Sequence, residues 1–177
     1  KIPELKDFLV DEKVDYHIQL SSISEAKVNN CILDKSKYRD IEYLAIESSH
    51  KSRFRVDSNI NDKKVDELYK KWVEKTYNNP KEHNIYITLE DENVTGMLTV
   101  KLDSMKYIIE LVAVHPEFHR RGIGGELLKM CFSDASKNGI KTIEVTTQLE
   151  NIGACKLYEK YGFRKKDITY VYHAHKE

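Results

Sequence analysis

The spacing of hydrophobic residues changes along the chain, from a helical pattern in the first half to a strand pattern after residue 84. Between residues 62 and 77, hydrophobic residues recur at i, i+3 and i+4, which predicts a helix that Asn78-Asn79-Pro80 ends. The earlier residues follow a weaker pattern. There we expect a strand over 16–20 and a helix over 34–49, with Asp34 as its N-cap.

From residue 85 onward, the pattern is that of strands separated by turns and helices. Strands are expected over 85–89, 94–102, 107–114, 141–147 and 163–173, and helices over 123–138 and 151–161. Short turns join the first three strands, which implies an antiparallel meander. The strand–helix–strand unit over 107–147 implies a right-handed parallel crossover in the same sheet. The predicted fold class is therefore α/β, with a mixed central sheet flanked by helices.

The domain organisation follows from length. A chain of 177 residues fits one domain with a small appendage. We expect residues 1–55 to form an N-terminal extension or partial lobe that packs on a main domain over 56–177.

Composition restricts the classes of function. The 29 basic and 29 acidic residues balance, so no net charge favours nucleic acid or a membrane as partner. No apolar run approaches the roughly 18 residues of a membrane span, and the first residues show no signal-peptide pattern. Cys31, Cys131 and Cys155 are odd in number and far apart, which argues against a disulfide framework and a metal site. We therefore expect a cytoplasmic protein without a bound metal.

The segment that follows the strand over 107–114 carries the clearest chemistry. It reads His119-Arg120-Arg121-Gly122-Ile123-Gly124-Gly125 and leads directly into a helix. The first N–H groups of a helix lack intrahelical partners, and the helix dipole adds partial positive charge there. Glycine lets a phosphate approach the backbone, and arginine adds charge-assisted hydrogen bonds. The segment predicts a phosphate site, although glycines can simply begin a helix and arginines can be solvated.

Two motifs together resemble the GCN5-related N-acetyltransferase (GNAT) superfamily. Residues 119–124 are similar to its Gln/Arg-x-x-Gly-x-Gly/Ala motif, with His119 in place of Gln or Arg. Residues 151–163 read Asn-Ile-Gly-Ala-Cys-Lys-Leu-Tyr-Glu-Lys-Tyr-Gly-Phe and resemble a second signature. The resemblance covers about residues 60–173. It implies the GNAT fold and direct transfer of acetyl from acetyl-CoA to an amine, without an acyl-enzyme.

The resemblance also implies roles for individual residues. The backbone of the glycine turn would hold the pyrophosphate, and the strand bearing Val112 and Val114 would bind pantetheine, with the Val114 N–H as oxyanion donor. Asn151 would contact the pantetheine arm, although it is also a good N-cap. Tyr158 would be the general acid that protonates the coenzyme A thiolate, unless it only belongs to an apolar stripe. The expected cofactor-binding residues are Val112, Val114, His119, Arg120, Arg121, Gly122, Ile123, Gly124, Gly125, Asn151 and Tyr158.

The general base is less defined by the sequence. Glu110 precedes the expected oxyanion donor in the same strand, although alternation could instead direct its side chain to solvent. Weaker candidates are His173, Tyr170 and Tyr172, and a water relay from backbone carbonyls would leave no signal in the side chains. Tyr170 and Tyr172 could equally form a wall of the acceptor site.

The acceptor is suggested by a narrower similarity. Residues 52–57, 69–74, 145–151 and 167–172 are similar to the dTDP-fucosamine acetyltransferases, GNAT enzymes that act on a nucleotide-linked 4-amino sugar. This implies a small-molecule amine as partner, with Arg53, Arg55, Tyr170 and Tyr172 as substrate residues. The alternatives are another amine (a protein N-terminus, a polyamine or an aminoglycoside) and a non-catalytic CoA-binding module. A homodimer is left open.

Overall fold

A computed structural model describes residues 1–20 and 35–174 of the chain. Its strands are β1 (Leu9–Gln19), β2 (His83–Glu90), β3 (Asn93–Leu102), β4 (Lys106–Val114), β5 (Thr142–Gln148) and β6 (Arg164–Tyr172). Its α-helices are α1 (Tyr38–Ser48), α2 (Arg53–Val56), α3 (Asp62–Asn78), α4 (Ile123–Lys137) and α5 (Ile152–Lys160). The 3-10 helices are η1 (Pro3–Phe8), η2 (Lys35–Lys37), η3 (Ser49–Lys51) and η4 (Pro116–Phe118).

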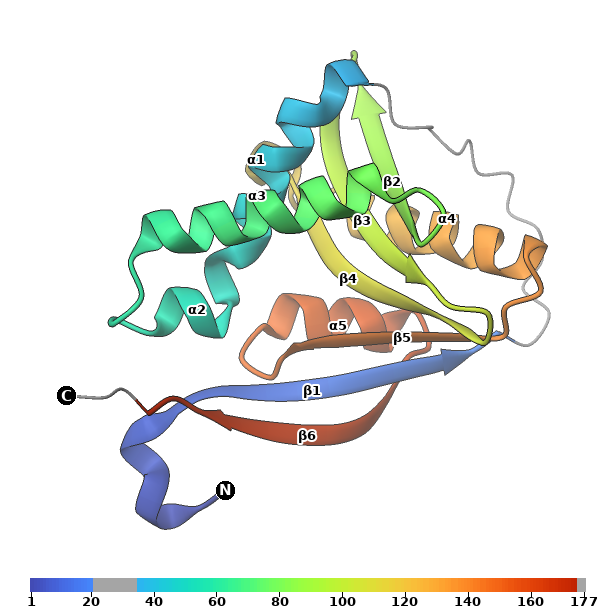
Figure 1. Ribbon diagram of the computed structural model, residues 1–177. Helices are drawn as coiled ribbons and strands as arrows, with labels where there is room; N and C mark the ends of the chain where they lie inside the picture. The colour runs from blue at the N-terminus through green and yellow to red at the C-terminus, as the bar shows by residue number, and fades with distance from the viewer. Residues whose placement is uncertain (21–34, 175–177) are drawn as a thin grey trace.

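The strands of the described residues form a single mixed sheet in the order β2-β3-β4-β5-β1-β6. β2, β3 and β4 make the predicted antiparallel meander, and β4 and β5 are the predicted parallel pair (Figure 1). β1 lies between β5 and β6 and is antiparallel to both. The α/β class is confirmed, and the first strand is an interior member of the sheet. The boundary at residue 55 stays a prediction.

The N-terminal part of the chain differs most from the sequence-based expectation. β1 begins at Leu9, well before the strand expected over 16–20. Its first residues include Asp11, Glu12 and Lys13, and these charges hide the alternation on which a strand prediction depends. The helix expected over 34–49 is shorter and begins at Tyr38, and Asp34 lies outside the described residues.

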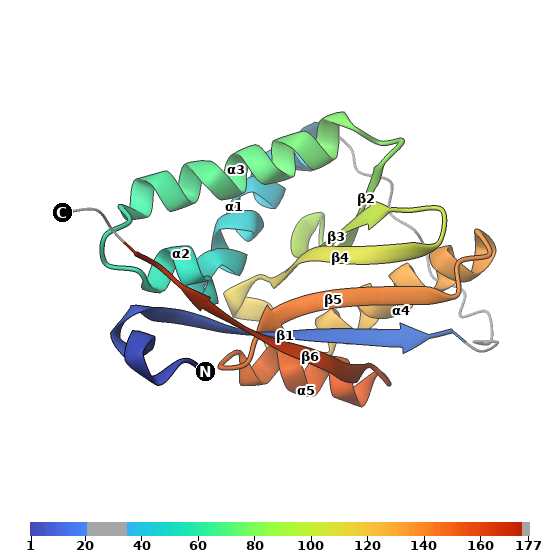
Figure 2. The ribbon, with the colours of Figure 1, turned by 60° about the horizontal axis from the view of Figure 1, so that its bottom comes forward.

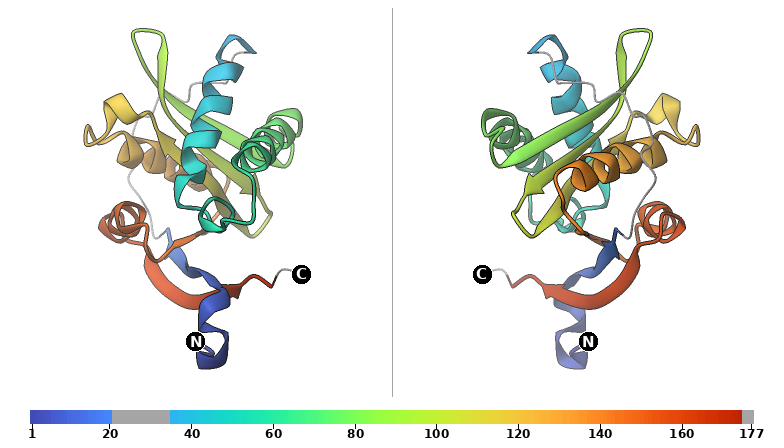
Figure 3. Two further views of the ribbon diagram at one scale, coloured as in Figure 1. Left: turned by 90° about the vertical axis from the view of Figure 1, so that its left-hand side faces the viewer. Right: turned by 90° about the vertical axis from the view of Figure 1, so that its right-hand side faces the viewer.

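The sheet separates two hydrophobic cores (Figure 3). On one face, α4 and α5 contribute Leu127 and Tyr158 to a core that includes Leu98 of β3. On the other face, α1 and α3 cover a core that includes Leu44 and Met97. The neighbours Met97 and Leu98 point to opposite faces, as the alternation of a strand requires. No helix in the described part of the chain is both long and apolar enough to cross a membrane.

β4 and β5 are hydrogen-bonded neighbours only at their beginnings. Their ladder runs from Lys106 opposite Thr142 to Ile109 opposite Val145. β4 continues to Val114 and β5 to Gln148, but beyond Ile109 the two strands diverge (Figure 1), whereas on its other side β5 stays paired with β1 (Figure 2). The sheet therefore opens along its middle, just before β4 leads into the glycine turn.

A β-bulge in β4 lies where this divergence begins. Leu111 pairs with Thr99 and Ile109 pairs with Val100, so Glu110 is the extra residue. Ile109 packs in the core on the α4 face, whereas Leu111 packs in the core on the α1 face. The N–H of Leu111 donates to Thr99 Oγ1 at 3.1 Å, which satisfies a buried donor at the bulge. The bulge thus changes which residues of β4 face each core and leaves Glu110 outside the regular pairing with β3.

A substitution of Gly96 in β3 tests how tightly α4 packs against the sheet. A Cβ at this position would lie 2.7 Å from Ile123 Cγ2 and 3.1 Å from Leu127 Cδ1. We predict that Gly96→Ala lowers the free energy of unfolding by about 1–3 kcal/mol through overpacking. It should also weaken acetyl-CoA binding, because Ile123 begins α4 at the predicted phosphate site. Urea unfolding and titration calorimetry measure the two effects.

The control for this substitution is Gly153→Ala in α5. The nearest atom to a Cβ at Gly153 is Asn151 Oδ1 at 3.8 Å, which is ordinary contact. Alanine favours a helix over glycine by about 1 kcal/mol, so this variant should be as stable as the wild type or more so. Equal stability of Gly96→Ala and the wild type would contradict the tight packing of α4 on β3.

Candidate active site

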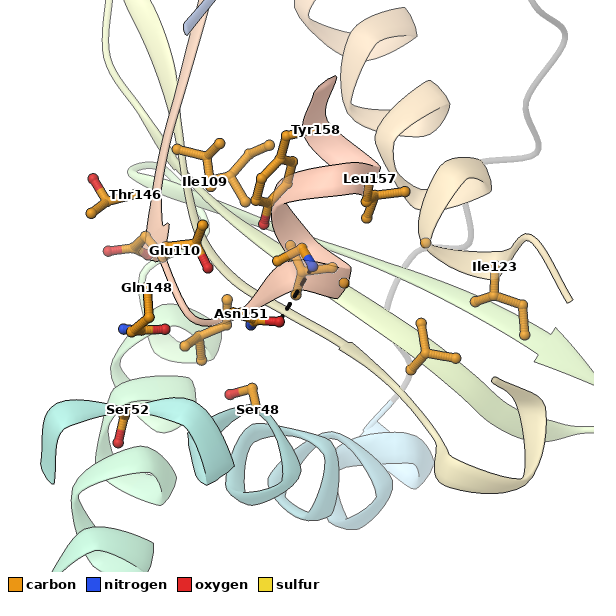
Figure 4. A pocket seen from close by; sticks show the side chains of 18 of the residues that line it. Ser48, Ser52, Ile109, Glu110, Ile123, Thr146, Gln148, Asn151, Leu157 and Tyr158 are labelled. Carbon is orange, nitrogen blue, oxygen red and sulfur yellow. Dashed lines mark hydrogen bonds between the residues drawn. The ribbon is translucent and has the colours of Figure 1, made fainter. Parts of the chain in front are cut away.

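A cleft of about 880 Å³ passes through the opening between β4 and β5. On the α4 side it is lined by the glycine turn and by one face of α5, and on the α1 side by residues of α1, α2 and α3. Figure 4 shows Tyr158 at one end of the view, Ser48 and Ser52 at the other, and Glu110 and Asn151 between them. Most of the predicted site residues therefore lie around a single cavity.

The glycine turn has a backbone suited to an anion. Arg120 and Gly122 adopt positive φ angles of 63° and 85°, which curl the chain before α4. The first intrahelical bonds of α4 run from the N–H groups of Gly125 and Glu126 to the carbonyl of Gly122, so the amide of Ile123 precedes the hydrogen-bonded part of the helix. Successive amides at a curled helix start form a concave anion site, and Arg120 adds a charge at its edge.

His119, the departure from the family motif, has a defined role in this turn. Its Nε2 donates to the carbonyl of Val114 at 2.9 Å, because the carbonyl can only accept. The bond ties the turn to the end of β4. Arg121 does not line the cleft; it pairs with Glu90 at 3.3 Å and lies over the ring of Phe118. Among the basic residues of the turn, His119 and Arg120 line the cleft.

Two of the glycines also permit close packing of α5. A Cβ on Gly124 would lie 3.1 Å from Leu157 Cδ2, and one on Gly125 would lie 1.9 Å from the hydroxyl of Tyr161. Glycine at these positions therefore serves the contact between the start of α4 and the C-terminal half of α5 as well as access to the amides. The phosphate interpretation and the packing interpretation of these residues are compatible.

Tyr158 is buried in the wall of the cleft and belongs to the core at the same time. Only 4% of it is exposed, and its ring packs against those of Tyr16 and Phe163 with centroids 5.8 and 5.5 Å away. Burial raises the pKa of Tyr158 above the ordinary value of a phenol. The hydroxyl therefore keeps its proton throughout the neutral range, as a proton donor must.

Asn151 and the end of β4 complete the α4 side. Asn151 is the N-cap of α5, its Oδ1 accepting from the N–H of Ala154 at 3.3 Å, and it also lines the cleft. The N-cap of α5 and the predicted contact with the pantetheine arm are therefore compatible at this residue. Val112 and Val114 line the cleft beyond the last pair of the β4–β5 ladder, where the β4 backbone has left its parallel neighbour.

Glu110, the predicted base, lines the cleft at the bulge of β4. Its carboxylate Oε2 lies 3.1 Å from Nδ1 of His83, a residue of β2. The Glu110 side chain is 16% exposed and that of His83 is 4% exposed. The bulge therefore presents a partly accessible carboxylate to the cleft, with a buried imidazole behind it.

The α1 side of the cleft contains both charged and aromatic groups. Lys13 of β1 and Arg53 of α2 supply positive charge, and the Arg53 guanidinium lies 4.2 Å from the ring centre of Phe54. Tyr69 and Trp72 of α3 add aromatic surface. Glu110 is the only carboxylate among the lining residues, all of which belong to the described part of the chain. This end is therefore basic and aromatic.

Three of the predicted substrate residues lie elsewhere. Arg55 bonds Asp66 at 2.6 Å and Ser49 at 2.7 Å and pairs with Asp62, so its guanidinium holds α2 to α3. Tyr172 accepts from the N–H of Ile2 at 2.9 Å, and Tyr170 lies under the Lys1 ammonium. None of the three lines the cleft, whereas Arg53 does.

The structure adds residues that the sequence did not indicate. Lys13 and His83 carry no motif, and Tyr69 and Trp72, although they lie in the similar segment 69–74, look like ordinary members of an apolar helix face and received no role from the sequence. Their common property is position in the fold, since they come from β1, β2 and α3. The described residues contain no group of three or more possible metal ligands.

Comparison with known proteins places this geometry in a family. Residues 34–163 match the model described as the acetyltransferase (GNAT) family. This match covers well over half of the chain, and the chain therefore belongs to the GNAT acetyltransferase family.

Individual relatives share the same region. The spore coat polysaccharide biosynthesis protein SpsD of Bacillus subtilis (strain 168) is 29% identical over 130 residues, which are 73% of this chain and 45% of SpsD. The ribosomal protein bS18-alanine N-acetyltransferase of Salmonella typhimurium is 32% identical over 106 residues, 58% of this chain and 70% of that protein. The chain thus spans less than half the length of the first relative.

A solved structure extends the comparison to a bound cosubstrate. The crystal structure of a GNAT family acetyltransferase from Elizabethkingia anophelis, with acetyl-CoA bound, aligns with a TM-score of 0.50 and 27% identity. The alignment covers 55% of this chain and 63% of that one.

Tyr158→Phe tests the predicted general acid. The ring contacts with Tyr16 and Phe163 remain in this variant, so acetyl-CoA affinity should change less than about threefold, while kcat falls by about 10²–10³-fold. Because the pKa of Tyr158 is raised, wild-type activity should not decline near pH 10 through this group. Thiol release and calorimetry measure the two quantities. Tyr77→Phe in α3 is the control, and full turnover by Tyr158→Phe would contradict the role.

Proposed function

We propose that this protein transfers the acetyl group of acetyl-CoA directly to the amine of a nucleotide-linked amino sugar. The observation that carries the proposal is the cleft itself, which joins an anion-binding turn on one face of the sheet to a basic, aromatic end on the other. A donor and an acceptor approaching from opposite faces would meet at the opening between β4 and β5. Direct transfer in a ternary complex requires this arrangement.

The donor side fits acetyl-CoA through its phosphates and its thioester. The amides before α4 and the Arg120 side chain would bind the pyrophosphate, and the diverging β4 would hydrogen-bond the pantetheine arm. The thioester would then reach the end of β4, where the N–H of Val114 is the proposed donor to the developing oxyanion. The acetyl-CoA complex of the Elizabethkingia relative supports this choice of donor.

The acceptor side favours a sugar linked to phosphates. Lys13 and Arg53 suit a diphosphate through charge-assisted hydrogen bonds, and Trp72 and Tyr69 offer flat surfaces to a sugar or base. The hydroxyl groups of Ser48 and Ser52 suit sugar hydroxyls. A polyamine would meet two cations and a single carboxylate here. The name of SpsD, a polysaccharide biosynthesis protein, is consistent with a sugar acceptor.

The proposed reaction uses two side chains for proton transfer. Glu110 takes a proton from the acceptor ammonium, and the free amine attacks the thioester carbon. The carbon–sulfur bond then breaks, and the sulfur takes the proton of the Tyr158 hydroxyl as negative charge develops there. The nitrogen loses its second proton to the Tyr158 phenolate, which restores the tyrosine. The amide product and coenzyme A leave, and Glu110 passes its proton to solvent. Because its pKa is raised, Tyr158 is protonated when the substrates bind.

A protein N-terminus is the second candidate, because the Salmonella relative is named as an alanine N-acetyltransferase of a ribosomal protein. A panel assay of coenzyme A release separates the candidates, with dTDP-4-amino-4,6-dideoxygalactose, spermidine and an alanine-initiated peptide as acceptors. We expect turnover with the nucleotide sugar and at most a trace with the others. Peptide turnover without sugar turnover would overturn the sugar proposal, and no turnover with intact acetyl-CoA binding would indicate a binding module.

Arg53→Gln tests the acceptor end directly. Loss of a charge-assisted hydrogen bond, worth about 1.5–3 kcal/mol, should raise KM for the nucleotide sugar at least about tenfold. KM for acetyl-CoA should stay constant, because Arg53 lies on the opposite face from the glycine turn. The exposed Arg164 of β6 provides the control Arg164→Gln. An unchanged sugar KM in Arg53→Gln would remove Arg53 from the site.

A further inference from the structure

His83 is a buried residue that the proposed mechanism does not yet use. It is the first residue of β2, and its backbone N–H donates to the carbonyl of Asn79. Its side chain is 4% exposed, and Nδ1 lies 3.1 Å from Oε2 of Glu110. A buried polar ring beside the carboxylate of a catalytic cleft is uncommon enough to need a physical account.

The two residues meet because they share one face of the sheet. Tyr86 of β2 belongs to the core on the α4 face and Ile87 to the core on the α1 face, so alternation places His83 on the α1 face. The bulge places Glu110 next to Leu111, which lies on that face as well. Between them runs β3, and its fully buried Thr99 supports the bulge through the N–H of Leu111. The pairing of His83 with Glu110 therefore depends on the bulge.

The short distance requires one proton between the two atoms. A bare imidazole nitrogen and a carboxylate oxygen would otherwise present lone pairs to each other at 3.1 Å. A carboxylic acid is ordinarily a stronger acid than an imidazolium, so the proton belongs on Nδ1. His83 is then the donor, and Oε2 of Glu110 is the acceptor.

We propose that His83 is a positioning residue that holds the Glu110 carboxylate through an Nδ1–H···Oε2 hydrogen bond and leaves Oε1 to take the proton of the acceptor amine. The inference rests on the proposed function, in which Glu110 is the base. It assigns a role to a β2 residue that lies outside both sequence motifs. The bond restricts rotation of a flexible side chain, which places the basic oxygen before the amine arrives.

Other titratable groups line the same cleft, and their charges contribute to the electrostatic potential around the His83–Glu110 bond. They come from β1 (Lys13), α2 (Arg53), α3 (Tyr69), the turn (His119 and Arg120) and α5 (Tyr158), whereas the lining residues of α1 and β5 carry no titratable side chain. These groups are the same in wild type and in His83 variants. A difference between the two enzymes therefore reports on the His83–Glu110 bond.

Three substitutions at His83 separate hydrogen bonding from packing. In His83→Asn, the side-chain amide nitrogen takes nearly the place of Nδ1 and can donate to Glu110, whereas His83→Gln places it nearer the position of Nε2. His83→Phe fills the volume without a donor. We expect kcat to fall about tenfold in the Phe and Gln variants and less than about threefold in the Asn variant. A general base contributes roughly 10²–10⁴-fold to the rate, and loss of its positioning should remove only part of that contribution. KM for acetyl-CoA should be constant, and thermal unfolding monitors folding.

The pH profile adds a readout that packing alone would not move. Without the donor, the Glu110 carboxylate holds a proton more readily, so the acid limb of kcat/KM should shift to higher pH in His83→Phe but not in His83→Asn. The control is His50→Phe, which removes the surface contact of His50 with Glu47 at 3.3 Å and should change neither kcat nor the acid limb. Equal kcat and an unshifted limb in a folded His83→Phe would overturn the proposal.

A measurement without acceptor keeps this inference separate from the proposed function. Carbon-13 NMR of glutamate side chains, with the Glu110 signal assigned by its loss in Glu110→Gln, gives the midpoint of carboxyl titration. We expect the midpoint to rise by at least about half a pH unit in His83→Phe. An unchanged midpoint would overturn the role of His83. No acetyl transfer by the wild type, with the midpoint shifted, would instead overturn the proposed function.

Discussion

The end of hydrogen bonding between β4 and β5 after Ile109 is the constraint on which the whole site depends. A sheet interior normally pairs its backbone groups, and unpaired groups away from water are costly. Here two strands that begin as parallel partners separate while both continue for several residues. The chain itself pairs one of these groups, because His119 donates a hydrogen bond to the carbonyl of Val114. The remaining polar backbone faces a cleft that a ligand with donors and acceptors along its length can fill.

The position of the turn proposed to bind an anion follows from glycine contacts on both sides of α4. Gly96 brings β3 against Ile123, and Gly125 brings the Tyr161 ring of α5 against the same first turn. The start of α4 is therefore held between the sheet and α5, so its amides have a fixed direction. A phosphate site that depends on backbone dipoles needs such rigidity, because a misdirected dipole stabilises little charge.

The two halves of the cleft differ in how far the sequence could predict them. The donor half is formed by the turn 119–125 and by α5, and each is a continuous segment with its own motif. A helix start, a glycine and an N-cap are local features, so such segments can be recognised in the sequence without a structure. The acceptor half combines Lys13, Arg53 and Trp72 from three separate elements, and no local pattern relates them. Arg55 shows the difficulty: it lies two positions from Arg53, yet its guanidinium is bound by Asp66.

The alternation of apolar residues was sufficient for the meander, the crossover and the two helices that flank it, because these elements are local and strongly periodic. The residues of the glycine turn and of α5 were indicated instead by two motifs and their resemblance to the GNAT family. Only the tertiary structure decided that β1 enters the sheet between β5 and β6, that a bulge sets Glu110 apart, and that His83 lies behind it. Strand order and register arise from pairings between distant parts of the chain, where the free energy depends on the whole packed core and not on any single segment.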